Sequence, residues 1–350
     1  MYYVPQNSKD RHNIQSAVGK MQILLAAMML AGLFAAGCVQ AVAPHAEPEK
    51  LPIIDSHGHL NGDISAETLI ALMNRSGVNR MVLMARYFTS AYDAGSGSDE
   101  QALDYSRRYL GRFIPFVAGQ RGSLGQRNRS RWLKPDGVAE NLLLEAEQKL
   151  RSGEFYGLGE FIIRHYDYEA HGQGGGEVDI PVDTPLMRRF AVLAEKFRVP
   201  LLLHAEGEPE VVNGMKSLLE YNPKAKVIWA HNCGRSSAEI IGQMLTRYTN
   251  LICDLGGMLN ASFAGYGRYW PRATQWMHLI EDGSGQLYPE MKALYERFPD
   301  RFLIGTDPAH TPALAHYENR IHRFRQLLSN LGPETAQRLA FKNAEALFRR

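Results

Sequence analysis

The chain from Leu51 onward alternates between short apolar runs of strand length and longer amphipathic segments of helix length. Such alternation is typical of βα units that build a parallel sheet. Eight apolar runs occur, and eight strands can close a barrel. We therefore predict an α/β fold, a (β/α)8 TIM barrel, over residues 51–350. The predicted strands lie at residues 53–54, 81–84, 113–117, 158–163, 200–203, 227–230, 251–253 and 302–304.

The predicted helices carry recognisable end signals. Ser65 can cap a helix whose Leu69, Leu72 and Met73 share one face, and Gly77 follows its end. Further helices are predicted at residues 142–150, 186–197, 211–221, 240–245 and 291–298. Each of these precedes a predicted strand, as repeated βα units require.

Histidines and carboxylates stand where several of the predicted strands end. His57 and His59 follow the first run one residue apart, and side chains at positions i and i+2 of a strand share a face. Singly, each such residue is more often a structural histidine or part of an ion pair. Together and in this order they predict a metal site at the strand ends. The four others are Glu160, His204, His231 and Asp307.

The order of these residues resembles the amidohydrolase superfamily: His-x-His on the first strand, Glu on the fourth, His on the fifth and sixth, and Asp on the eighth. The resemblance extends from Leu51 to the C-terminus, and residues 342–348 are similar to the closing helix of the family. It implies a barrel whose metals lie at the C-terminal mouth.

Electrostatics suggests a role for each ligand. Two divalent cations about 3.5 to 4 Å apart repel each other, so a two-metal site needs an anionic bridge. Glu160 can be that bridge; the phosphotriesterase branch has a carboxylated lysine there, whereas TatD-type nucleases resemble this chain in using glutamate. We expect His57, His59 and Asp307 to hold one metal and His204 and His231 the other. The expected cofactor is a divalent metal, zinc, with two ions per chain.

Asp307 is the predicted catalytic residue. A divalent metal lowers the pKa of a bound water to near 7, and Asp307 can accept the proton as the water attacks a polarised carbonyl or phosphoryl group. Arg164 shares a strand face with Glu160 and could hold a substrate carboxylate or phosphate, with a surface arginine as the equal alternative. Asp55 is expected behind the ligands rather than among them.

Two long loops follow predicted strands. Residues 255–288 carry Phe263, Tyr266, Tyr269, Trp270 and Trp276 among glycines and could form either a substrate lid or a helical hairpin that packs on the barrel. Residues 119–136 carry four arginines and a lysine. They could attract an anion, but a solvated run of charge is the commoner explanation.

The N-terminus has the order of a secretory signal. Residues 1–20 are polar with three basic side chains, and residues 21–37 are apolar apart from one glutamine. The run ends at Cys38 in a pattern that resembles the lipobox of bacterial lipoproteins, although Ala35 stands where leucine is usual. We predict a signal peptide over residues 1–37, lipidation of Cys38 and a tether over residues 38–50. The protein would then be anchored to the membrane on the periplasmic side of a bacterial envelope, with an uncleaved helix as the alternative.

Two cysteines remain in the predicted barrel, Cys233 and Cys253. Their spacing does not match a CxxC redox or zinc motif. We expect them to be free, buried thiols, even though an exported protein could oxidise them.

Composition and missing motifs narrow the function. The net charge of +2 gives no reason to expect nucleic acid as a partner. No G-x-S-x-G or P-loop pattern occurs, so serine hydrolysis and nucleotide chemistry lack support. We predict a metal-dependent hydrolase of a small-molecule ester, lactone, amide or phosphoester. The alternatives are a mononuclear decarboxylase or hydratase of the amidohydrolase-related branch, and a non-catalytic, ligand-binding envelope lipoprotein.

Overall fold

The computed structural model describes residues 51–87, 95–166, 177–259 and 278–349. None of the helices in these ranges combines the length and the apolar character needed to cross a bilayer. The predicted signal peptide, Cys38 and the tether lie outside the described residues. Residues 260–277, the part of the long loop that carries Phe263, Tyr266, Tyr269, Trp270 and Trp276, also lie outside the described residues.

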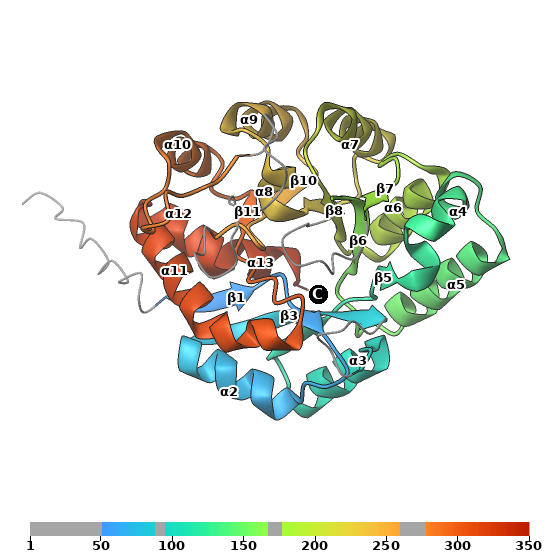
Figure 1. Cartoon of the computed structure of the whole chain (residues 1–350), viewed down its shortest axis with the longest axis horizontal. Coiled ribbons are helices and arrows are strands. Elements are labelled where there is room, and N and C mark those ends of the chain that lie inside the picture. The colour runs from blue at the N-terminus through green and yellow to red at the C-terminus, as the bar shows by residue number, and fades with distance from the viewer. Residues whose placement is uncertain (1–50, 88–94, 167–176, 260–277, 350) are drawn as a thin grey trace, which may run out of the picture. The chain divides into compact units, whose positions relative to one another are not determined.

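Parallel strands form an inner wall with helices around it (Figure 1). Within the described residues the wall has two sheets, in the orders β1–β3–β4 and β6–β8–β9–β10–β11. The bounds are β1 (Ile53–Asp55), β3 (Val78–Tyr87), β4 (Phe113–Pro115), β6 (Leu158–His165), β8 (Leu201–Ala205), β9 (Val227–Trp229), β10 (Leu251–Asp254) and β11 (Phe302–Leu303). These strands agree with the eight that the sequence predicts.

Backbone hydrogen bonds beyond the strands join the two sheets. At one junction the N–H of Val117 donates to the carbonyl of Gly157 and the N–H of Gly159 donates to the carbonyl of Val117, both at 2.9 Å. At the other, the N–H of Ser56 donates to the carbonyl of Ile304 at 2.8 Å. The fold is therefore the predicted (β/α)8 barrel.

Three short strands extend the wall beyond the C-terminal ends of the main strands. β2 (His59–Leu60) and β5 (Gln120–Arg121) pair with the last residues of β3, which is long enough to reach past its neighbours. β7 (Val178–Asp179) pairs antiparallel with the end of β6. They add backbone around the mouth, where the candidate ligands lie.

The helices surround the barrel, and α2, α3, α5, α6 and α9 begin at residues whose side chains cap them. Ser65 accepts a hydrogen bond from the N–H of Thr68 at the start of α2, and Gly77 ends that helix with a left-handed φ of 68°. The main helices are α2 (Ala66–Ser76), α3 (Asp99–Arg108), α5 (Gly137–Arg151), α6 (Pro185–Phe197), α7 (Pro209–Tyr221), α9 (Ala238–Arg247), α10 (Pro289–Arg297) and α11 (Tyr317–Ser329). Shorter ones are α4 (Arg129–Leu133), α8 (Ala230–Arg235), α12 (Pro333–Gln337) and α13 (Asn343–Leu347).

Apolar side chains fill the barrel below the mouth. Ile54, Val82 and Leu202 belong to a buried cluster inside the strands. Phe348, which directly follows α13, joins this cluster, and its ring lies 5.7 Å from the ring of Phe116. The C-terminal segment thus closes the lower end, as the expected closing helix would, and leaves the polar end of the barrel for chemistry.

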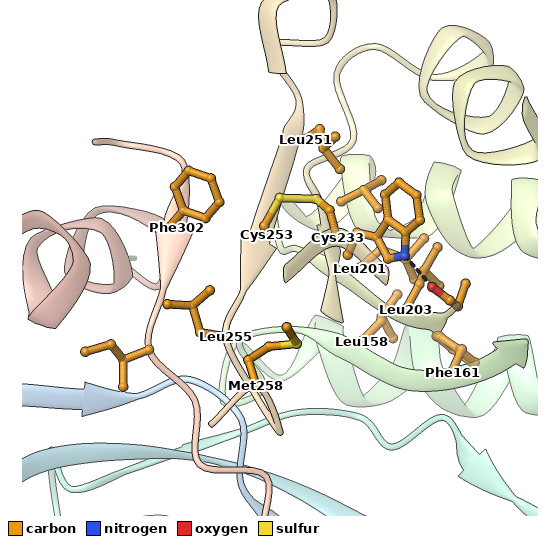
Figure 2. Packing of buried hydrophobic residues seen from close by; sticks show 14 of the residues in the cluster. Leu158, Phe161, Leu201, Leu203, Cys233, Leu251, Cys253, Leu255, Met258 and Phe302 are labelled. Atoms are coloured by element: carbon orange, nitrogen blue, oxygen red, sulfur yellow. Dashed lines mark hydrogen bonds between the residues drawn. A yellow bond between two sulfur atoms is a disulfide. The ribbon is translucent and has the colours of Figure 1, made fainter. Parts of the chain in front are cut away.

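The expectation of free cysteine thiols is wrong. Cys233 and Cys253 form a disulfide, with Cα atoms 5.0 Å apart, inside the core beside Leu201 and Leu251 (Figure 2). The two residues are 20 positions apart in the chain, and they meet because the turn after β9 packs against β10. Sequence spacing alone carries no information on that packing.

The arginines of residues 119–136 are largely engaged within the fold. Arg121 binds the buried Asp99 at 2.9 Å and Glu145 at 3.1 Å, and Arg131 binds Asp136 at 2.8 Å. The segment contains β5, α4 and two short 3-10 turns, so it is more structured than a loop. Compensation of these charges disfavours an anion-attracting role.

Candidate metal centre

The six predicted ligand residues converge at the C-terminal mouth of the barrel. Five of them are buried, whereas the Asp307 side chain is 18% exposed and faces the opening. Their chain positions follow from the strands: each lies in a strand or within a few residues after one. His57 follows β1, His59 begins β2, Glu160 lies in β6, His204 in β8, His231 follows β9 and Asp307 follows β11.

The first group of ligand atoms comes from His57, His59 and Glu160. The two Nε2 atoms lie 3.3 Å apart, and Nε2 of His59 lies 3.4 Å from Oε2 of Glu160. Asp307 completes the group, because its Oδ1 lies 3.2 Å from Nε2 of His59 and 3.7 Å from Nε2 of His57. These side chains lie close enough together for the first metal that we expect, and their role as its ligands stays a prediction.

The second group comes from Glu160, His204 and His231. Oε1 of Glu160 lies 3.3 Å from Nδ1 of His204 and 3.6 Å from Nε2 of His231. The same two histidine nitrogens lie only 2.7 Å apart. Glu160 is thus shared by both groups. Oε1 faces His204, His231 and also Nε2 of His57 at 3.5 Å, whereas Oε2 faces His59.

Hydrogen bonds on the far side of the imidazoles fix which nitrogens face the centre. Nδ1 of His231 lies 2.7 Å from the carbonyl oxygen of Gly256, which can only accept, so this nitrogen carries the hydrogen and Nε2 keeps its lone pair. Nδ1 of His57 likewise faces Asp254 at 3.1 Å, and Nε2 of His204 faces Glu206 at 3.0 Å. Such carboxylate partners orient metal-binding histidines in proteins.

This arrangement fits a cation. When His204 is neutral, its Nδ1 lone pair faces the Nε2 lone pair of His231, and Oε1 of Glu160 is buried without a hydrogen-bond partner among the described residues. Facing acceptors are unfavourable unless a positive charge lies between them. Imidazole nitrogens with carboxylate oxygens are the donor set that zinc and related divalent ions prefer.

Protons compete for the same lone pairs. Burial lowers the pKa of His57, but the carboxylates of Asp254, Glu160 and Asp307 raise it well above its ordinary value. Burial also opposes protonation of His204, yet the carboxylates of Glu160 and Glu206 raise its pKa to about 9. The pKa of Glu160 is lowered well below its usual range, because the neighbouring imidazoles outweigh its burial. The carboxylates of the centre are therefore ionised, which is the state that binds a cation.

Several residues that hold the ligand side chains in place were not identified from the sequence. Asp254 is the last residue of β10, and Glu206 follows His204 at i+2, so strand ends and alternation could have identified both. Arg235 binds both oxygens of Glu206 at 2.7 and 2.8 Å, and together with His204 it lowers the pKa of that buried carboxyl to about 2. Gln120 donates to Oε2 of Glu160 at 2.7 Å.

Asp55 lies behind the ligands, as expected. Its Oδ1 accepts hydrogen bonds from the N–H groups of Thr306 at 2.9 Å and His57 at 3.2 Å. Its Oδ2 accepts from the hydroxyls of Thr306 at 2.5 Å and Tyr317 at 3.1 Å. One buried carboxylate thus fixes the backbone beside two ligands, His57 and Asp307.

Arg164 lies at the mouth but is already paired. Its guanidinium binds Glu208 at 2.5 Å and Glu177 at 2.7 Å, and it stacks 4.0 Å from the ring centre of Tyr166. Two carboxylates compensate its charge, so a substrate anion would have to compete with them. Its role in substrate binding stays a prediction.

The turn that carries His231 has an unusual backbone. His231, Asn232, Cys233 and Arg235 have φ angles of 58°, 51°, 53° and 61°, and Gly234 between them has 71°. A left-handed conformation costs an L-amino acid about 1–2 kcal/mol per residue and normally occurs at single positions. Gly234 is required there, since a Cβ would lie 2.5 Å from the carbonyl oxygen of Ala205. Such a run persists only where its surroundings hold it.

Comparisons with known proteins agree on the fold. A family model described as Amidohydrolase matches residues 54–350. An uncharacterized TIM-barrel protein from Bordetella bronchiseptica is similar in structure, with a TM-score of 0.56 and 16% identity over 85% of this chain and 98% of that one. Among curated proteins, none matches this chain in sequence.

Two further solved structures have related barrels. One is a probable 2-pyrone-4,6-dicarboxylic acid hydrolase from Acinetobacter baumannii with citric acid bound, with a TM-score of 0.52 and 14% identity over 85% of this chain and 99% of that one. The other is a dihydroxybenzoic acid decarboxylase from Polaromonas sp. JS666 with bound manganese and the inhibitor 2-nitroresorcinol, with a TM-score of 0.52 and 13% identity over 85% and 97%. At these identities the likeness shows the shared fold.

Proposed function

Because this chain belongs to the amidohydrolase family, we propose that it is a metal-dependent hydrolase that cleaves an ester, lactone, amide or phosphoester of a small molecule. Family membership makes it a metal-dependent enzyme with the amidohydrolase fold. The proposal of hydrolysis goes further and depends on one observation. That observation is the position of Glu160 between the two groups of ligands.

A shared carboxylate is what a two-metal centre needs. Glu160 would bridge the ions, His57, His59 and Asp307 would hold one of them, and His204 and His231 would hold the other. Divalent ions bound there would supply Lewis-acid activation of water and of a carbonyl or phosphoryl oxygen. This chemistry supports hydrolysis, since the nucleophile would be water rather than a side chain.

Asp307 is suited to move the proton. Its carboxylate is the most exposed of the ligand set. Burial raises the pKa of Asp307, but the charge of His57 and the hydrogen bond with His59 lower it by more, so the carboxylate stays ionised. Its backbone N–H donates to the carbonyl of His57 at 2.8 Å, which fixes the side chain at the rim of the centre. Asp307 would accept a proton from the attacking water and return it to the leaving group.

The experiment that tests this proposal measures both metal content and the source of the new oxygen atom. We expect the purified protein to hold about two zinc ions per chain and to hydrolyse members of a panel of lactones, esters and phosphoesters. In water enriched in ¹⁸O, one ¹⁸O atom should enter the carboxylic or phosphoric acid product of each turnover, and none should enter the alcohol or amine. Release of carbon dioxide from aromatic carboxylates with one metal per chain would instead establish the decarboxylase alternative, which the same fold also supports.

We propose in addition that residues 51–350 form the catalytic domain and that Cys38 carries a lipid anchor on the periplasmic side of a bacterial envelope. The apolar run that ends at Cys38 supports this location. The disulfide between Cys233 and Cys253 also supports it, because structural disulfides persist mainly in oxidising compartments.

A further inference from the structure

The left-handed turn at residues 231–235 carries two groups that the metal centre needs. Its first residue, His231, directs Nε2 toward Oε1 of Glu160 at 3.6 Å. Its last residue, Arg235, binds Glu206, which in turn holds Nε2 of His204 at 3.0 Å. Both histidines of the second ligand group therefore depend on the position of this one turn.

The disulfide joins the middle of that turn to β10, the strand that supports His57. Cys253 directly precedes Asp254 on β10, and Asp254 faces Nδ1 of His57 at 3.1 Å. The other oxygen of Asp254 accepts from the N–H of Gly256 at 2.7 Å, and the carbonyl of Gly256 faces Nδ1 of His231. The disulfide, which Figure 2 shows in the core, thus lies beside a chain of hydrogen bonds that links both ligand groups.

The barrel wall does not need this bond. β9 and β10 already pair in parallel through Leu251–Val227, Ile252–Ile228 and Cys253–Trp229. Hydrogen bonds also hold the turn: the N–H of Gly207 donates to the carbonyl of Gly234 and the N–H of His278 to the carbonyl of Arg235, both at 2.7 Å. The disulfide is the covalent restraint among these contacts. What the disulfide adds is the placement of a backbone segment that L-residues do not favour.

We propose that the Cys233–Cys253 disulfide is a positioning element of the metal centre, which holds the left-handed turn so that His231 faces Glu160 and the Arg235–Glu206 pair orients His204. This inference rests on the proposed metal-dependent function. Both cysteines are fully buried, so the bond is protected from reductants in the folded protein. Its effect is on metal affinity rather than on the chemical step.

The test compares zinc binding by the full chain with that of two variants, C233A/C253A and C233A/C253V. The second variant retains more of the buried volume. We expect both to keep the far-ultraviolet circular dichroism of the barrel and to bind zinc at least tenfold more weakly in calorimetric titration. Leu69→Ala is the matched control: Leu69 is a buried residue of α2, outside the centre, so this change should lower Tm without weakening zinc binding.

The outcomes separate the two claims. Absence of zinc binding by the unmutated chain would overturn the proposed function and this inference with it. Normal binding by the unmutated chain and by either disulfide variant would overturn the inference alone. Loss of the barrel in both variants would also overturn it, because the bond would then hold the fold as a whole. An equal loss of affinity in Leu69→Ala would assign the effect to general destabilisation.

Discussion

Oε1 of Glu160 lies 3.3 Å from Nδ1 of His204, yet this buried oxygen has no hydrogen-bond partner among the described residues. In the neutral imidazole of His204, Nε2 donates to Glu206 and Nδ1 is an acceptor, so two acceptors then face each other. The two atoms are therefore suited to bind one cation together, and we derive predictions for metal binding and turnover from this arrangement.

The first prediction concerns Glu160. Glu160→Gln keeps the shape of the side chain but removes the negative charge that screens two cations. We expect metal content to fall from about two ions per chain toward one, measured by elemental analysis. Glu208→Gln is the control, because Glu208 binds Arg164 at the same mouth and belongs to neither ligand group. An unchanged metal content in Glu160→Gln would contradict the bridging role of Glu160.

The second prediction concerns Asp307. Asp307→Asn removes the proton acceptor and one ligand charge, so kcat should fall by about 10²–10⁴-fold. The fold should be intact, since Asp307 is partly exposed and makes its backbone contact through the N–H. The control is the exposed Asp104→Asn, which should have wild-type turnover. Activity of Asp307→Asn within a few-fold of wild type would contradict the catalytic role.

The third prediction concerns Asp254, which faces His57 from behind. Asp254→Asn keeps the size of the side chain but removes the charge that orients the imidazole and raises its basicity. Zinc affinity should fall by about 10–100-fold, as is typical for such supporting carboxylates. The measurement is competition with a chromogenic chelator. The exposed surface residue Asp282 provides a control in Asp282→Asn, and equal affinities of the two variants would argue against the supporting role.

The fourth prediction concerns location. In cells given labelled fatty acid, the unmutated protein should carry label and sediment with membranes, because acyl chains supply the anchoring energy. Cys38→Ala should be unlabelled and either soluble in the envelope or retained as an uncleaved precursor. An unlabelled wild-type protein that still contains residues 1–37 would favour an uncleaved helix as the anchor.

Much of the fold and the ligand set could be predicted because both depend on local periodicity. Apolar runs located the strands, and the C-terminal ends of parallel strands meet at one mouth, so His57 and His204 could be brought together without coordinates. Glu206 and Asp254 obey the same rules, but ordinary acidic residues at strand ends are common and nothing local distinguishes them.

The remaining features depend on tertiary packing. The left-handed run at residues 231–235 contains a single glycine, so its residue types do not reveal it. The disulfide depends on that turn packing against β10, and the pairing of Arg164 depends on Glu177 and Glu208 from other segments. Such contacts follow from the assembled barrel and have no signature in the spacing of residues.

A crystal structure of the zinc-loaded protein, with anomalous diffraction collected on both sides of the zinc absorption edge, tests the metal centre most directly. Two anomalous peaks should flank Glu160, one among His57, His59 and Asp307 and the other between His204 and His231. A single peak would favour the mononuclear alternative. If crystals grown with zinc in the solution show no peak within bonding distance of Glu160, this result would contradict the proposed centre.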